Sequence, residues 1–314
     1  MKAAPTTSMS INTNLPKDHE ARMRRALLSL DGLSVGDGFG ETFFTATDII
    51  ETRLKYREAP PQPWFVTDDT MMALSIVRCM KRSGRIDQDA LATAFAQEFV
   101  REPNRGYGGM ARVILYSISE GISWKAAASQ AFNGQGSCGN GGAMRSAPIG
   151  AYFCDDYDRV IYEAKCSAEV THAHPDGKTG AVAAALAAAW MAREDRRSTK
   201  ATPALLEFVL EHTPQTETYY GLQTALSLRF DTSPRSAARL LGNGSRVIAS
   251  DTVPFCLWCA ARHPDSYTDA LWATVEGLGD RDTTCAIVGG IVAMSAGRES
   301  IPTQWLEARE MINV

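Results

Sequence analysis

The segment DQDALATAFAQEFVREP, residues 87–103, sets the predicted fold class. Its apolar residues Leu91, Phe95 and Phe99 recur at every fourth position, which places them on one face of an α-helix. Asp87 is the expected N-cap, because its side-chain oxygen can accept hydrogen bonds from backbone N–H groups of the first turn. Pro103 ends the pattern, since proline cannot continue a helix. The segment is therefore predicted to be an amphipathic helix.

The same helical spacing recurs on both sides of this segment. Helices are expected over residues 21–33, 70–81, 124–132, 181–193, 203–211, 233–241, 252–262, 266–276, 283–296 and 302–312. Alternating apolar runs of strand length are nearly absent, so the chain is predicted to be all-α. Because its 314 residues are 45% hydrophobic, we expect one compact multi-helix domain, an orthogonal bundle over residues 22–314.

The first 21 residues differ in composition from the rest of the chain. They are rich in Ser, Thr, Asn and Pro and show no hydrophobic period, so a flexible N-terminal arm is expected. Residues 1–15 hold no apolar stretch of signal-peptide length. The cysteines are odd in number, seven, and lack disulfide-like spacing, which favours a reducing compartment, the cytoplasm. Cys256 and Cys259 lie in an apolar segment and are interpreted as a buried helix face.

The charge balance limits the classes of partner. A formal net charge of -4 provides no general attraction to polyanions, so neither nucleic acid nor an anionic membrane is expected as a partner. The most apolar run, residues 180–192, is too short to span a bilayer. It is predicted to be a buried core helix.

Two segments far apart in the sequence each combine carboxylates with threonines. They are Thr67-Asp68-Asp69-Thr70 and Asp280-Arg281-Asp282-Thr283-Thr284, each at the start of a predicted helix. Hard cations such as Mg²⁺ prefer carboxylate, hydroxyl and water oxygens. Helix capping would explain one Asp for each helix, but crowded carboxylates repel one another without a cation. Spacing alone leaves metal binding and capping as equal alternatives.

Read together, several motifs resemble the ADP-ribosylglycohydrolase family, also called the dinitrogenase reductase-activating glycohydrolase family. The matching stretches run in the family's order over roughly residues 25–298: Gly36-Asp37-Gly38-Phe39-Gly40, Thr67-Asp68-Asp69-Thr70, Arg105-Gly106-Tyr107-Gly108, Gly136-Ser137-Cys138-Gly139-Asn140-Gly141-Gly142-Ala143-Met144-Arg145, Thr171-His172 and Gly279-Asp280-Arg281-Asp282-Thr283. The resemblance implies an all-α fold with a cleft that holds two Mg²⁺ ions, with Mn²⁺ as the alternative. The implied metal ligands are Thr67, Asp68, Asp69, Asp280, Asp282 and Thr283.

The loop motifs are most similar to the branch that contains the serine-specific ADP-ribosyl hydrolase. In that branch the glycine-rich loop cradles diphosphate and ribose, and backbone N–H groups can reach phosphate oxygens because no side chain blocks them. Phe132 matches an aromatic residue that stacks on adenine, whereas Cys138 stands where a second aromatic residue would close the other face. The implied substrate-binding residues are Gly106, Tyr107, Gly108, Phe132, Gly136, Ser137, Cys138, Gly139, Asn140 and His172.

The resemblance also implies a reaction. Cleavage at C1″ of ribose passes through a positively charged ring and requires a nucleophilic water. A bound metal would orient the ribose hydroxyls and activate that water, with Asp69 or Glu41 as general base and Asp282 as the ligand shared by both ions. Glu41 is assigned here although the family glutamate usually lies a few residues later, where this chain has Phe44.

Several alternatives stay open at this point. The substrate is expected to be an ADP-ribosylated protein, linked through serine or arginine, and the product ADP-ribose. Some relatives instead neutralise an ADP-ribosyltransferase toxin by physical blocking, for which the N-terminal arm is a candidate. An isoprenoid-synthase type of diphosphate site does not fit, because Met72 stands three positions after Asp69 and no DDxxD spacing occurs.

Overall fold

The computed structural model describes residues 15–193, 202–229 and 231–314, and its regular secondary structure there is entirely helical. Isolated bridges join Trp64 to Arg309 and Gly139 to Ile248, and no strand forms in these ranges. The all-α prediction is confirmed. The helices are α1 His19–Glu41, α2 Thr47–Tyr56, α3 Asp68–Ser83, α4 Gln88–Arg101, α5 Gly109–Ser119, α6 Trp124–Gly134, η1 Asn140–Gly142, α7 Ala147–Tyr152, α8 Tyr157–Glu169, α9 Pro175–Met191, α10 Thr202–His212, α11 Glu217–Ser227, α12 Pro234–Leu241, α13 Ala249–Arg262, α14 Tyr267–Glu276, α15 Arg281–Ala296, η3 Arg298–Ser300 and α16 Thr303–Ala308.

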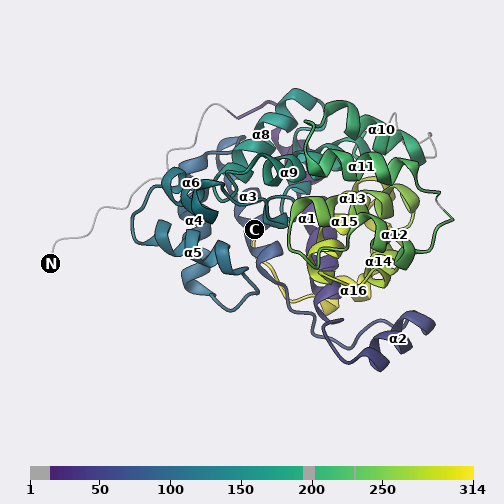
Figure 1. Cartoon of the computed structure of the whole chain (residues 1–314). Coiled ribbons are helices and arrows are strands. Elements are labelled where there is room, and N and C mark those ends of the chain that lie inside the picture. The colour runs from purple at the N-terminus through teal and green to yellow at the C-terminus, as the bar shows by residue number, and fades with distance from the viewer. Residues whose placement is uncertain (1–14, 194–201, 230) are drawn as a thin grey trace.

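Two long helices, α1 and α15, lie antiparallel against each other over several turns and make the most extensive contact between any two of the described helices (Figure 1). Gly32, Gly36 and Gly40 share one face of α1, because four-residue steps return to the same side of a helix. A Cβ on Gly36 would lie 2.2 Å from the carbonyl oxygen of Cys285. One on Gly40 would lie 2.2 Å from the carbonyl oxygen of Arg281. The glycines therefore let the end of α1 lie directly against the start of α15.

Gly36→Ala is expected to destabilise the protein by about 3 kcal/mol, because an added methyl group in so close a contact forces the two backbones apart. Urea unfolding monitored by circular dichroism measures the change. Gly109→Ala is the matched control, since no atom of the described residues lies within 4 Å of a Cβ at that position. Equal unfolding midpoints for the two variants would show that the helices do not touch through Gly36.

Helix α9 forms the other half of the core. Its residues from 179 to 191 are all buried, and it packs on α7, α8, α13 and α15. The buried helix predicted for residues 181–193 is thus confirmed, although it begins at Pro175. The start lies earlier because the side chain of His174 caps the helix by accepting a hydrogen bond from the backbone N–H of Asp176.

The sequence patterns missed some helices and shortened others. α2, α5, α7, α8 and α11 were not predicted, and α1 continues through its glycines to Glu41. Helix α1 also begins at His19, so residues 19–21 of the expected arm belong to it. Residues 1–14 of that arm lie outside the described residues, as does any blocking role assigned to them. Cys256 and Cys259 are buried in α13, as expected.

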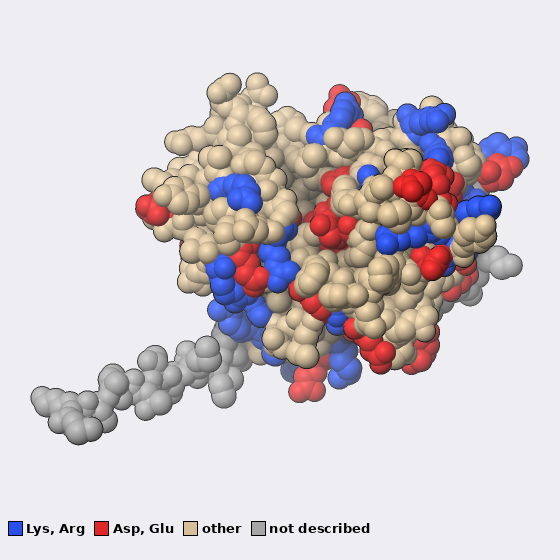
Figure 2. Space-filling view, turned by 90° about the horizontal axis from the view of Figure 1, so that it is seen from below, with Lys and Arg blue, Asp and Glu red and all other residues tan. Residues whose placement is uncertain are grey.

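The surface carries charges of both signs. On the face seen from below, Lys and Arg side chains are interspersed with Asp and Glu (Figure 2). Within the part of the chain that the structure describes, no helix combines the length and the apolar character needed to cross a membrane.

Candidate active site

A cavity of about 500 Å³ lies where the starts of α3 and α15 meet. Asp68 and Asp69 enter it from α3, and Asp280, Asp282 and Thr283 from the start of α15. Segments more than two hundred residues apart thus face a single space. The expectation that the two acidic clusters converge is met by this geometry.

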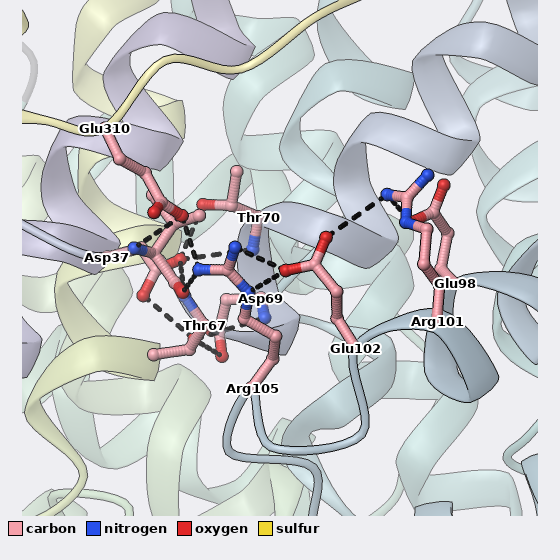
Figure 3. Close-up of polar contacts among 10 residues, drawn as sticks. Asp37, Thr67, Asp69, Thr70, Glu98, Arg101, Glu102, Arg105 and Glu310 are labelled. Carbon is pink, nitrogen blue, oxygen red and sulfur yellow. Dashed lines mark hydrogen bonds and ion pairs between the residues drawn. The ribbon is translucent and has the colours of Figure 1, made fainter.

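The start of α3 is held in place by Asp37, a buried residue of α1. Its carboxylate accepts hydrogen bonds from the backbone N–H groups of Thr67 at 2.9 Å and Thr70 at 3.2 Å. It also accepts from the hydroxyls of Thr67 at 2.9 Å and Thr70 at 2.5 Å. Figure 3 shows Asp37 inside this ring of donors. Asp37 therefore fixes the turn from which Asp68 and Asp69 project.

A charged network fastens the neighbouring segment to the same turn. The backbone N–H of Asp68 donates to the carbonyl of Arg105 at 2.6 Å. The Arg105 guanidinium bonds to the carbonyl of Val66 and pairs with Glu102 and Glu310 (Figure 3). This places Gly106 beside the cavity, so close that a Cβ there would lie 3.2 Å from an oxygen of Asp68.

The carboxylates are not used as helix caps. Asp280 occupies the N-cap position of α15 but makes no side-chain capping bond, and instead accepts a hydrogen bond from the Asn140 side chain at 2.7 Å. One carboxylate oxygen of Asp69 and one of Asp282 are buried without a hydrogen-bond partner among the described residues. Since buried polar atoms are normally paired, these two oxygens call for a ligand. The capping alternative does not account for the clusters.

Electrostatics support the same conclusion. Burial, followed by the charges of Asp282 and Asp37, raises the pKa of Asp68 well above its usual range. Burial likewise raises the pKa of Asp69 well above that range. Burial and the charge of Asp282 raise the pKa of Asp280 to about 7. Carboxylates this crowded are best ionised beside a cation.

The donor set fits a divalent cation, because it offers carboxylate and hydroxyl oxygens without sulfur or imidazole. The hydroxyl of Thr283 lies 3.4 Å from Asp69, which links the two helix starts. Over residues 15–193, 202–229 and 231–314, no three Asp, Glu, His or Cys side chains form a ready-made metal site.

The opposite wall of the cavity is the glycine-rich loop. Ser137, Cys138, Gly139, Asn140 and Gly141 all line it. Two backbone hydrogen bonds tie the loop to residues 247–249, where α13 begins: Asn140 N–H donates to the carbonyl of Val247, and Ala249 N–H donates to the carbonyl of Cys138. Its shape is thereby fixed.

Phe132 projects at the rim of the same cavity. Its side chain is 51% exposed, and its backbone has φ of 52° in a non-helical break at the end of α6. A left-handed conformation is uncommon for a bulky residue and is often found at ligand sites. An exposed aromatic ring beside a glycine loop suits stacking on a flat base.

Some predicted site residues lie outside the cavity lining, namely Glu41, Thr67, Tyr107 and Gly136. Tyr107 is buried with its ring 5.2 Å from that of Phe99, so its side chain packs against α4. Thr67 is the N-cap of α3. Glu41 ends α1 close enough to Asp282 that burial and this charge raise its pKa to about 7. Gly136 has φ of 76° and touches residues 173 and 174.

The structure also adds lining residues that were not assigned. Met110, Ala111 and Ile114 come from the unpredicted α5, and Arg246, Val247 and Ile248 from the segment before α13. The four-residue step from Met110 to Ile114 and Ile118 was a signal for α5. No motif marks residues 246–248.

The family model described as ADP-ribosylglycohydrolase matches residues 17–312. The chain belongs to the ADP-ribosylglycohydrolase family. The resemblance carried by the motifs is confirmed, and this ADP-ribosylglycohydrolase is an enzyme.

Relatives of this ADP-ribosylglycohydrolase come from animals and bacteria. It is 31% identical over 278 residues to ADP-ribosylhydrolase ARH3 of Bos taurus, with 78% of this chain and 74% of the relative covered. It is 28% identical to ADP-ribosylhydrolase ARH3 of Homo sapiens, with 90% and 88% covered. Identity to ADP-ribosyl-[dinitrogen reductase] glycohydrolase of Rhodospirillum rubrum is 26%, with 91% and 90% covered.

A solved structure has the same fold. It is titled ADP-ribosylglycohydrolase-related protein complex, with a TM-score of 0.62, 24% sequence identity and coverage of 93% of this chain and 94% of the other. At this identity the likeness concerns the helical architecture.

Proposed function

We propose that this enzyme removes ADP-ribose from modified protein side chains by hydrolysis at C1″ of the ribose, in a reaction that depends on divalent cations. One observation carries the proposal: the acidic starts of α3 and α15 and the glycine-rich loop line the same cavity. The acidic helix starts supply the negative charge that a positively charged transition state and its attacking water need. The glycine-rich loop supplies backbone N–H groups for a diphosphate.

The cation site would be formed by Asp68, Asp69, Asp280, Asp282 and Thr283, with two Mg²⁺ ions proposed and Mn²⁺ as the alternative. Thr67 acts on it indirectly, because its hydroxyl donates to Asp37 and lies 3.1 Å from an oxygen of Asp69. When bound, such ions supply positive charge beside the ribose and activate water.

Asp69 and Glu41 are the proposed proton acceptors. Asp69 lines the cavity, and one of its carboxylate oxygens has no hydrogen-bond partner among the described residues, so it is the group proposed to accept a proton from water. Glu41, with its pKa raised to about 7, can exchange a proton near neutral pH. Its place outside the cavity lining makes Asp69 the stronger candidate.

The acceptor side chain is best tested directly. We propose serine-linked ADP-ribose as the preferred substrate, since the chain's loop motif and its ARH3 relatives point to the same branch. Purified enzyme is incubated with serine-linked and arginine-linked ADP-ribosyl peptides and with O-acetyl ADP-ribose, and released ADP-ribose is quantified. Faster release from the arginine-linked peptide would reverse the preference, and release from none would refute the function.

The stability of the cation-free enzyme is expected to fall as pH rises, and cation binding to strengthen. Asp37, Asp280 and Glu41 have their pKa raised to about 7, from ordinary values near 4. Between pH 4 and pH 7 the folded protein therefore binds more protons at these three groups than the unfolded chain does. Their contribution to the free energy of unfolding falls as pH rises through this range. The cation-free enzyme should therefore lose stability from pH 4 to pH 7.

Thermal unfolding with and without Mg²⁺ measures this effect. The rise in Tm on adding Mg²⁺ is expected to be larger at pH 7.5 than at pH 5, because ions bind the ionised carboxylates. A rise of equal size at both values, or none, would contradict a carboxylate site.

A further inference from the structure

A buried cationic side chain in the wall of the cavity has a role that the reaction leaves unassigned. Arg145 is 1% exposed, and burial lowers its pKa to about 9, so it stays charged at neutral pH. Its guanidinium donates to the carbonyl of Ser167 at 3.1 Å and to the hydroxyl of Thr171 at 2.8 Å. It also lies over the ring of Phe95, 4.5 Å from the centroid. A buried charge held in this way calls for an explanation.

The direction of the next hydrogen bond follows from the chemistry of arginine. A guanidinium has no acceptor, so the Thr171 oxygen must accept from Arg145. The same oxygen lies 2.7 Å from Nδ1 of His172. Its single hydrogen has no other acceptor in the described parts of the chain, so it points to Nδ1. Nδ1 is then the acceptor, and the ring proton resides on Nε2.

His172 presents this Nε2 at the cavity wall. A Cβ on Gly139 would lie 3.2 Å from Nε2, and one on Gly141 would lie 3.3 Å from it. A Cβ on Gly177 would lie 3.2 Å from the ring carbon Cδ2. The absence of side chains at these glycines therefore lets their backbone lie close to the imidazole, and His172 lines the cavity. No hydrogen bond from Nε2 to a residue in the described ranges occurs.

The ring is also neutral at working pH. Burial and the charge of Arg145 lower the pKa of His172 to about 3. A neutral imidazole carries one N–H, and its partner decides which nitrogen bears it.

We propose that Arg145 and Thr171 are positioning residues that hold His172 as the neutral tautomer with its proton on Nε2, so that this N–H donates to an acceptor oxygen of bound ADP-ribose. The identity of the ligand rests on the proposed function. The other tautomer would direct a lone pair at the ligand and repel a phosphate or ring oxygen.

Thr171→Val tests the proposal, because it removes the hydroxyl and keeps the shape, whereas Thr171→Ser keeps the hydroxyl. Nitrogen NMR of the labelled protein identifies the protonated ring nitrogen of His172 independently of activity. In the wild type and Thr171→Ser we expect the proton on Nε2, and in Thr171→Val a mixture or the proton on Nδ1. Thr274→Val, at a buried threonine of α14, is the matched control and should change nothing at His172.

Affinity for ADP-ribose, measured by calorimetry, gives the second readout. Thr171→Val should weaken binding about tenfold, the effect of one lost hydrogen bond, while Thr171→Ser stays within about twofold. A wild-type His172 with its proton on Nδ1 overturns the proposal even if Thr171→Val fails to fold. So does a Thr171→Val variant with unchanged tautomer and affinity. A wild type that binds no ADP-ribose refutes the proposed function instead, while the NMR result still decides whether the tautomer is held.

Discussion

Asp282→Ala is expected to lower kcat by roughly a thousandfold or more, since a lost cation site removes several kcal/mol of transition-state stabilisation. Asp282 has a buried oxygen without a hydrogen-bond partner in the described parts of the chain, and its charge raises the pKa of Asp68, Asp69, Asp280 and Glu41. It is therefore the carboxylate most central to the cluster. Release of ADP-ribose from a modified peptide measures the loss.

The same variant is also expected to change the thermal stability of the protein and its response to Mg²⁺. Without divalent cations, Asp282→Ala is expected to raise Tm, because it removes repulsion from the other carboxylates. With Mg²⁺, the stabilisation seen in the wild type should disappear. Asp265→Ala, an exposed aspartate on the loop before α14, is the control and should alter neither. An active Asp282→Ala enzyme that Mg²⁺ still stabilises would remove Asp282 from the site. Asp68→Ala is expected to show the same loss of turnover.

Asp37→Ala is expected to destabilise the protein by about 3 kcal/mol and to lower turnover about a hundredfold. The substitution leaves the N–H groups of Thr67 and Thr70 without their acceptor, at the turn that positions Asp68 and Asp69. Urea unfolding and the hydrolysis assay together measure the two losses.

Asp37→Asn is the matched control for this position. Its amide oxygen can keep the bonds from Thr67 N–H and from Thr70, while its NH₂ group donates to the Thr67 hydroxyl. The hydrogen of that hydroxyl can then turn to Asp69, 3.1 Å away. We expect Asp37→Asn to stay within about 1 kcal/mol of the wild type. If Asp37→Ala and Asp37→Asn have the same urea unfolding midpoint and the same rate of hydrolysis, Asp37 does not anchor the turn.

The acidic clusters could be read from the sequence because each is short and its chemistry is local. Adjacent carboxylates at Asp68 and Asp69 repel one another, so their crowding made a cation site an equal alternative to helix capping on the sequence alone. Asp37 could not be found in this way. It is a single aspartate between glycines, and its function appears only when α1 brings it beside Thr67 and Thr70.

Helix α1 shows why the helix boundaries were harder to predict. Glycine weakens an isolated helix, so the pattern ended near residue 33. In the folded protein Gly32, Gly36 and Gly40 allow close packing on α15, and this tertiary contact outweighs the local preference. Tyr107 was assigned to the substrate through its place in the Arg105-Gly106-Tyr107-Gly108 motif, yet the fold buries its side chain outside the cavity lining.

The most direct test is the release of ADP-ribose from a serine-linked peptide by enzyme stripped of metal with EDTA and then reloaded. We predict no release by the stripped enzyme and recovery with Mg²⁺ or Mn²⁺, because the cavity carboxylates need a cation to act. Undiminished release by enzyme shown by elemental analysis to be free of metal would contradict the account.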